Sequence, residues 1–118
     1  MVFKKNITEY NFDKEVVDLV IQFNQIIKDN DLKKIKKLLG AFTLEILNKI
    51  KNNKITSKVA DKAYLLLDLF FTDNMPELRD DSTISQLLFE GNILHDLGQS
   101  YGADLKLMEA LANKLLSN

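Results

Sequence analysis

The chain has 118 residues, no cysteine and a formal net charge of −1 at pH 7. This length predicts a single domain, residues 1–118, that buries roughly 60–70% of its unfolded surface without disulfides or metal ions. The lack of cysteine excludes disulfides, zinc–thiolate sites, iron–sulfur clusters and thiol nucleophiles. The first residues, MVFKKN, carry charge where a signal peptide needs apolar residues. The longest uncharged run, residues 19–27, is far shorter than the ~20 residues of a membrane span, so we expect a soluble, cytoplasmic protein without a membrane partner.

The near-neutral net charge conceals a strong asymmetry along the chain. Residues 28–62 contain ten lysines and four acidic residues, whereas residues 63–118 contain three basic and nine acidic residues. Such a distribution indicates that the two halves pair within the fold, that they pair between subunits, or that a basic surface meets an anionic partner.

The first part of the chain predicts an arm followed by a helix. Residues 1–12 hold apolar side chains without helical or strand periodicity, so we expect an arm that packs on the bundle or on a neighbouring molecule. Residues 13–28 place apolar side chains at helical spacing and acidic residues in the first turn, which predicts one amphipathic helix. Asn30 and Asp31 are expected to end this helix and to cap the next.

The second helix is predicted over about residues 32–51 and begins with a cluster of lysines. Positive charges at a helix N-terminus oppose the helix dipole, so these lysines are not placed to stabilise the helix. Gly40 is expected either to split this helix or to let another backbone approach closely. Asn52 and Asn53 favour the left-handed conformation that often ends a helix.

The fold is organised around a central helix, predicted over about residues 57–72. Its apolar residues extend almost all round the helix, so we expect the other helices, or an identical subunit, to cover it. One polar strip is predicted, formed by Asp61, Tyr64, Asp68 and Thr72. We expect this strip to contact the second helix, with salt links from Asp61 or Asp68 to the lysines there.

Pro76 is expected to end the central helix, and residues 72–82 to form the longest polar connection, with one short turn. A capping box over residues 83–86 predicts a fourth helix that runs through His95, and Asp104 is expected to cap a fifth helix. Alternating β-branched runs are absent from the sequence. These patterns predict an all-α fold, a single-domain bundle of four to five antiparallel helices.

The only histidine of the chain, His95, raises the question of a functional site. Gly91, His95 and Gly98 share a predicted face of the fourth helix, which suggests a crevice where the histidine binds a ligand or transfers a proton. A metal site would need further ligands, and Glu90 and Asp96 are expected to point away from the ring. We favour a structural histidine with a hydrogen-bond partner.

The residues around His95, GNILHD, resemble the Arg-Asn-x-x-x-His stretch of the helical HEPN ribonucleases. In that family the arginine and the histidine of two subunits meet to cleave RNA, so the resemblance implies a related helical fold. The residue five positions before His95 is Glu90, and the only arginine of the chain is Arg79. The resemblance therefore implies a relative without ribonuclease activity.

A lysine patch provides a further hypothesis. Phosphate neutralisation needs only cations on one face, so such a patch is suited to an anionic partner such as nucleic acid. Specific nucleic-acid readers usually add arginine or stacking aromatic residues, and none interleaves with these lysines, so we prefer a solvated or subunit-pairing surface. The patch consists of Lys33, Lys34, Lys36, Lys37, Lys51, Lys54 and Lys58.

The known phosphate-binding and catalytic signatures are missing from the sequence. The glycines fit neither the P-loop nor the dinucleotide fingerprint, and a His-Glu-x-x-His motif is absent. We therefore predict no catalytic residue, metal ligand or cofactor. The preferred function is a non-enzymatic interaction module, a homodimer through the central helix that also binds another protein. The alternatives are a nucleic-acid-associated protein that uses the second helix and an enzyme built on His95.

Overall fold

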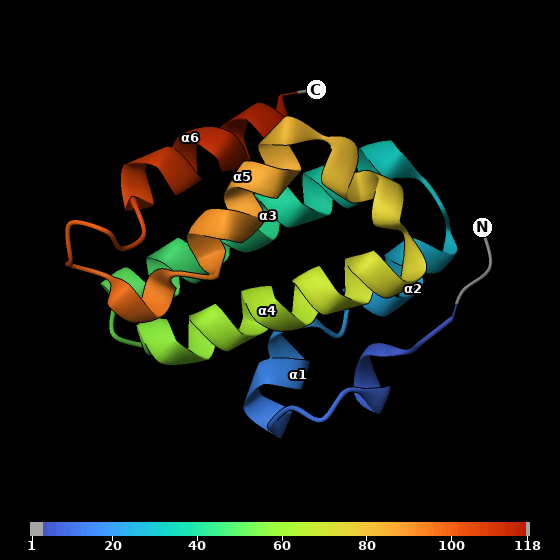
Figure 1. The fold of residues 1–118 in the computed structure, drawn as a ribbon, viewed down its shortest axis with the longest axis horizontal. Coiled ribbons are helices and arrows are strands. Elements are labelled where there is room, and N and C mark those ends of the chain that lie inside the picture. The colour runs from blue at the N-terminus through green and yellow to red at the C-terminus, as the bar shows by residue number, and fades with distance from the viewer. Residues whose placement is uncertain (1–3, 118) are drawn as a thin grey trace.

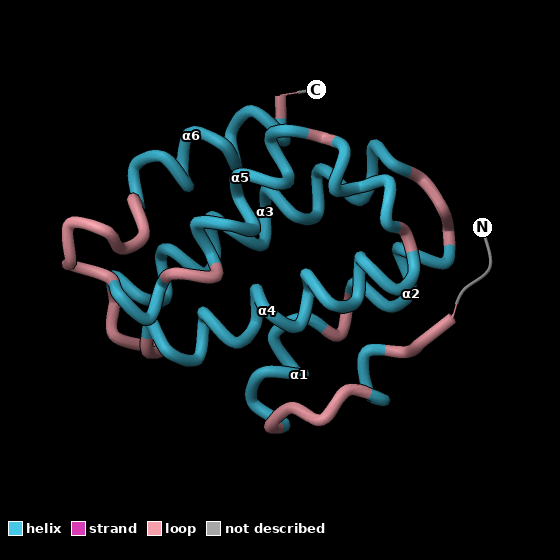
Figure 2. Tube along the Cα trace, in the orientation of Figure 1, coloured by secondary structure: helices cyan, strands magenta, loops and turns pink. Residues whose placement is uncertain are grey.

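The computed structural model describes residues 4–117 and shows a bundle of helices joined by short loops (Figures 1 and 2). No β-strand occurs in this part of the chain, so the predicted all-α bundle is confirmed. None of the helices described is long and apolar enough to cross a membrane. The elements are η1 (Ile7–Glu9), α1 (Lys14–Val20), α2 (Phe23–Lys28), α3 (Leu32–Lys51), α4 (Ser57–Asn74), η2 (Pro76–Asp80), α5 (Ser82–Gly91), η3 (Leu94–Asp96) and α6 (Leu105–Leu116), where η marks a 3₁₀ helix.

The two longest helices, α3 and α4, form the frame of the bundle. Helix α6 packs along α3, and α5 lies against both α4 and α6 (Figure 1). On the other side of α4 lies α1, whereas α2 packs against α3. Helix α4 thus has neighbours on both of its flanks, as expected of the central element.

The inner face of α4 is buried, but its outer face is not. The buried residues are Ala60, Ala63, Tyr64, Leu66, Leu67, Phe70, Phe71 and Asn74. On the outer face, Leu65 is 41% exposed and Leu69 is 42% exposed. The bundle therefore encloses most of this apolar helix and leaves two of its leucines facing solvent.

Tyr64 is the part of the predicted polar strip that the structure contradicts. Its side chain is fully buried, and its hydroxyl lies 2.7 Å from the hydroxyl of Thr43, which is also fully buried. The ring packs edge-on against Phe42, with ring centroids 5.5 Å apart. Tyrosine has an apolar body and a polar tip, so its place on a helix wheel does not tell whether it faces the core.

The single helix predicted over residues 13–28 is divided into α1 and α2. Ile21 and Gln22 form the turn between them, and both keep right-handed helical dihedral angles. The division follows from packing, because α1 lies against α4 and α2 lies against α3. Beyond α2, Asn30 adopts a positive φ of 51° and the Asp31 side chain caps α3, as predicted.

One buried amide holds the N-terminal arm on the end of α4. The Asn74 Oδ1 atom accepts hydrogen bonds from the backbone N–H groups of Lys4 and Lys5, at 2.8 and 2.9 Å. Its Nδ2 atom donates to the carbonyl groups of Lys5 and Phe70, at 2.9 Å each. From Lys4 onwards the arm therefore packs on the bundle, while its first three residues lie outside the described ones.

The connection predicted over residues 72–82 is mostly helical. Helix α4 continues to Asn74, and η2 supplies the short turn that was expected after Pro76. Pro76 lies at the start of η2, where its missing N–H group is tolerated. The longest loop of the described chain is instead residues 97–104, between η3 and α6.

Asp81 caps α5, in place of the predicted capping box over residues 83–86. Its carboxylate accepts hydrogen bonds from the N–H groups of Thr83 and Ile84, at 2.9 and 3.0 Å, and pairs with the Lys36 ammonium at 2.9 Å. Burial by itself raises the pKa of the Asp81 carboxyl, but the hydrogen bonds from Ile84 and Thr83 together with Lys36 outweigh it and lower the pKa. The cap therefore also ties α5 to α3.

Two glycines mark close approaches between helices. A Cβ atom at Gly40 would lie 2.7 Å from the carbonyl oxygen of Ala112. Gly40 therefore lets the backbone of α6 approach α3, which is one of its two predicted roles, and α3 itself is unbroken. A Cβ atom at Gly91 would lie 2.2 Å from the Tyr64 ring. Helix α5 ends here, and the prediction that it runs through His95 is wrong because the chain turns to pack η3 against α4.

Candidate interaction surface

The outer face of α4 carries a row of exposed side chains, which we call the α4 ridge. Its members are separated alternately by four and three positions, the spacing that aligns side chains along one helix face. The row changes from basic to apolar to polar along the helix. The α4 ridge consists of Lys58, Lys62, Leu65, Leu69 and Thr72.

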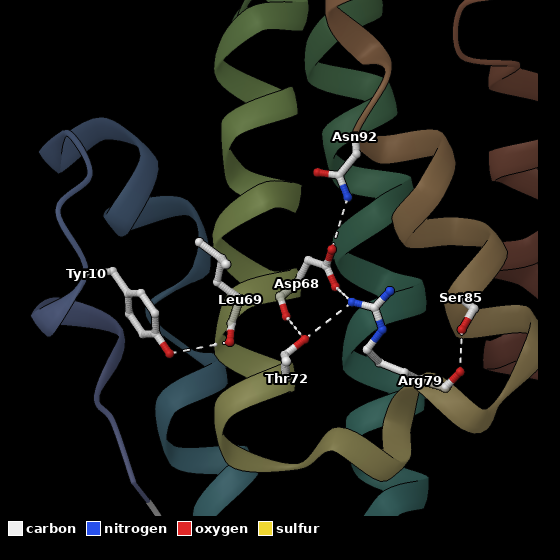
Figure 3. Close-up of polar contacts among 7 residues, drawn as sticks. All are labelled: Tyr10, Asp68, Leu69, Thr72, Arg79, Ser85 and Asn92. Atoms are coloured by element: carbon white, nitrogen blue, oxygen red, sulfur yellow. Dashed lines mark hydrogen bonds and ion pairs between the residues drawn. The ribbon is translucent and has the colours of Figure 1, made fainter.

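A polar network borders the edge of the α4 ridge that faces α5 (Figure 3). The Arg79 guanidinium donates to the Asp68 carboxylate and, at 3.3 Å, to the Thr72 hydroxyl. Asp68 also accepts a hydrogen bond from the Asn92 side chain at 3.5 Å, and the Ser85 hydroxyl donates to the Arg79 carbonyl at 2.5 Å. The only arginine of the chain is thus held between α4 and α5, with 46% of its side chain exposed.

The N-terminal arm borders the opposite edge of the α4 ridge. The Tyr10 hydroxyl donates to the Asp73 carboxylate at 2.5 Å and lies 3.5 Å from the Leu69 carbonyl oxygen, a contact drawn in Figure 3. The Lys5 ammonium lies 4.2 Å from the centroid of the Tyr10 ring, a cation–π distance. Burial and the hydrogen bond to Asp73 raise the pKa of Tyr10 far above its ordinary value, so the phenol stays protonated at neutral pH.

Phe89 adds an exposed aromatic ring near the polar network. Its side chain is 64% exposed. Ser85, Phe89 and Asn92 follow helical spacing on one face of α5, and both polar residues contact the network. Aromatic and arginine side chains supply much of the binding energy at protein interfaces, so Phe89 and Arg79 are suited to that role.

The structure places His95 in η3, with 47% of its side chain exposed. Its Nδ1 atom lies 3.1 Å from Oδ1 of Asp61, and its Nε2 atom lies 3.2 Å from Oδ2 of Asp96. The expectation that Asp96 points away is wrong, because residues 94–96 form a 3₁₀ turn instead of continuing the α-helix. The hydrogen bond with Asp61 raises the pKa of His95, although loss of hydration acts in the opposite direction.

The three residues of the predicted crevice lie in different settings. Gly91 is buried against the ring of Tyr64, which occupies the space beside it. Gly98 lies in the exposed loop with a positive φ of 95°, and no atom lies within 4 Å of its Cβ position. His95 is therefore not flanked by two glycines on one helix face.

The seven lysines of the predicted patch fall into two groups at opposite ends of α3. One group occupies residues 33–37 and the other residues 51–58. At 1.5 Å of rise per residue, about 21 Å of helix separates Lys37 from Lys51. The seven lysines therefore do not form a single compact anion site. A nucleic-acid role for either group stays a prediction.

The salt links predicted between α4 and the start of α3 are wrong. Asp61 and Asp68 pair with His95 and Arg79 instead of with Lys33 or Lys37. The reason is geometric, because α3 contacts the buried face of α4, to which neither carboxylate belongs.

A pocket of about 280 Å³ opens between α1 and α3, away from the α4 ridge. The buried side chains of Phe42 and Ile46 line it together with Asp18, Glu45 and Lys49. Asp18 and Glu45 each pair with a lysine one helical turn away, which neutralises their charge locally. Within residues 4–117 no group of three or more His, Cys, Asp or Glu side chains is arranged to hold a metal ion.

Comparison of the chain with protein-family models, curated proteins and solved structures gives no match. The HEPN resemblance gains no support from these comparisons and stays a prediction. Glu90, at the arginine position of that family, accepts a hydrogen bond from the Asp104 N–H group at 2.8 Å, next to the start of α6.

Sequence reasoning missed the α4 ridge and the network around Arg79. The spacing of the ridge is present in the sequence, but the apolar pattern that extends almost all round the central helix predicts that Leu65 and Leu69 are covered. The sequence contains no comparable pattern for the network, because Asp68, Arg79 and Asn92 come from three different parts of the chain and meet only after folding.

Proposed function

We propose that this protein is a non-enzymatic interaction module that binds another protein chain through the α4 ridge. The observation that carries the proposal is the exposure of Leu65 and Leu69, at 41% and 42%, one turn apart on the outer face of the central helix. Single exposed leucines are common on protein surfaces, whereas adjoining ones with polar borders are typical of interaction sites.

The surroundings of the two leucines support binding. The polar network around Arg79 holds one edge of the α4 ridge, and the contact between Tyr10 and Asp73 holds the other. A surface fixed in this way loses little conformational entropy when a partner binds. Phe89 and Arg79 offer the side-chain types that act as anchors at interfaces.

The non-enzymatic part of the proposal rests on where the ionisable groups lie. General acid–base catalysis needs its groups around a bound substrate, shielded from bulk water. His95, with its partners Asp61 and Asp96, lies on the open surface and does not line the pocket between α1 and α3.

The cytoplasm is the compartment that we propose for this protein.

Site-specific photo-crosslinking tests the proposal. A photoreactive amino acid replaces either Leu65 or Leu107, an exposed leucine of α6 that serves as the matched control. In cells that express the full chain, we expect the Leu65 position to give one discrete crosslinked product and the Leu107 position to give none. Equal products from both positions, or none from either, would contradict a binding role for the α4 ridge.

A further inference from the structure

We propose that the partner of the α4 ridge is a second copy of this chain, bound antiparallel about a two-fold axis between Leu65 and Leu69. The inference rests on the proposed function, because it names the partner of the same surface. Homo-oligomers most often form such two-fold contacts, in which one patch binds its own copy.

The first argument is the spacing of the α4 ridge. Positions that alternate by four and three form the seam along which two helices pack, as in coiled coils. In the two-fold arrangement each Leu65 would pack on the Leu69 of the partner copy. The four leucines would then form the apolar centre of the contact.

The second argument is charge complementarity. Before the leucines the exposed surface carries Lys58 and Lys62, and after them it carries Asp73 and Glu77. Within the described residues, Lys58, Lys62 and Glu77 make no ion pair closer than 4.0 Å. A parallel pairing would place like charges together, whereas the antiparallel pairing places lysines opposite carboxylates. The pairing also gives a role to the charge asymmetry of the chain.

The third argument is the register of these charges. Position 67 is the midpoint between Leu65 and Leu69, and Lys62 lies five residues before it while Asp73 lies six after it. An antiparallel pairing about this midpoint therefore places Lys62 beside Asp73 of the other copy. Lys58 lies nine residues before the midpoint, whereas Glu77 lies in η2, beyond the end of α4, so the register concerns Lys62 and Asp73.

We expect a weak, concentration-dependent dimer, because the contact is centred on one face of a single helix. A stable interface usually buries about 800 Å² on each partner. The accessible surface of the chain is 6540 Å², so such an interface takes roughly an eighth of it. An interface of this size would have to include the borders of the α4 ridge, Arg79 and Phe89 among them.

Sedimentation analysis of the full chain tests whether the dimer uses the α4 ridge. From about 5 to 500 µM we expect wild type to pass from monomer to dimer, and the Leu65→Asp variant to stay monomeric. Leu107→Asp is the matched control and should dimerise like wild type, and circular dichroism should show that both variants are folded. A wild type that stays monomeric throughout, or a Leu65→Asp variant that dimerises as well as wild type, would overturn the inference.

Charge exchange tests the antiparallel register. Lys62→Asp alone and Asp73→Lys alone should each weaken the dimer by about three- to tenfold, because each exposed pair occurs twice in a symmetric dimer. The double variant Lys62→Asp with Asp73→Lys should restore the wild-type dissociation constant. A double variant as weak as the two single changes combined would overturn the register.

The two proposals fail in distinguishable ways. A monomer in sedimentation, together with a Leu65 crosslink to a different protein, would overturn the self-association and leave the interaction module supported. A monomer without any specific crosslink at Leu65 would overturn both.

Discussion

The hydroxyl groups of Thr43 and Tyr64 lie 2.7 Å apart in the interior of the bundle, where both side chains are fully buried. They join α3 to α4, two helices whose other contacts are few. A buried hydroxyl without a partner costs free energy, so this pair links the stability of the two helices. Burial also raises the pKa of Tyr64 far above its ordinary value, although the hydrogen bond with Thr43 acts in the opposite direction, so the pair does not titrate near neutral pH.

Removing one hydroxyl of this pair should lower the free energy of unfolding by more than half of the loss caused by removing both hydroxyls. We expect Tyr64→Phe and Thr43→Val each to lower the free energy of unfolding by about 1–3 kcal/mol, because the remaining hydroxyl stays buried and unpaired. The double variant should lose clearly less than the sum of the two single losses. Urea denaturation of all four proteins measures this coupling, and strictly additive losses would contradict it.

The Asn74 side chain should control the order of the N-terminal arm. Asn74→Ala removes the groups that satisfy the N–H groups of Lys4 and Lys5, so we expect a loss of about 2–3 kcal/mol in the free energy of unfolding. Hydrogen exchange at these two amides should accelerate as well. Asn48→Ala, on the exposed surface of α3, is the control and should change stability by less than about 0.5 kcal/mol. Unchanged exchange at Lys4 and Lys5 would show that another contact holds the arm.

Adding a methyl group at Gly91 should disturb the packing of Tyr64. Alanine usually stabilises a helix by about 1 kcal/mol relative to glycine. Here its Cβ atom would lie 2.2 Å from the Tyr64 ring, so the ring must move. We expect Gly91→Ala to destabilise the protein by about 1–3 kcal/mol and to shift the near-ultraviolet signal of tyrosine. Gln86→Ala, at an exposed position of the same helix, should stay within about 0.5 kcal/mol of wild type, and a stabilised Gly91→Ala variant would refute the contact.

The pair formed by His95 and Asp61 should make stability depend on pH. The folded-state pKa of His95 is raised, so its protonated form is favoured in the folded protein. The stability that this pair contributes is therefore fully present below the unfolded pKa of about 6.5 and is lost as pH rises through the higher folded pKa. The difference in unfolding free energy between wild type and His95→Gln should thus be largest below about pH 6.5 and shrink as the pH rises through the folded-state pKa.

Proton NMR titration of the single histidine measures this pKa directly. In the Asp61→Asn variant we expect the pKa of His95 to fall back toward its ordinary value, because the Asp61 hydrogen bond is the largest cause of the shift. A wild-type pKa at or below about 6.5 would show that the pair does not persist in solution.

The sequence alone predicted the helices and most of their ends. Asp31 and Asp104 cap the helices that follow them, Asn53 has the expected positive φ of 57°, and Pro76 follows the end of α4. These features depend on residues within one or two helical turns of one another, so a local pattern is enough to reveal them. The exceptions are α5, which Asp81 caps just before the predicted box and which ends early at Gly91, and the division of residues 13–28 into α1 and α2.

The tertiary structure decided which side chains face the core and which polar groups meet. Helical periodicity does not tell that Tyr64 is buried against Gly91 or that Leu65 stays exposed, because each depends on where the flanking helices stop. Nor does it predict that Asp61 meets His95 and Asp68 meets Arg79, since these partners come together only after α5 ends early and η2 and η3 pack on α4. Local spacing determines a helix through its own backbone hydrogen bonds, whereas the packing of the whole chain selects its neighbours and leaves the α4 ridge uncovered.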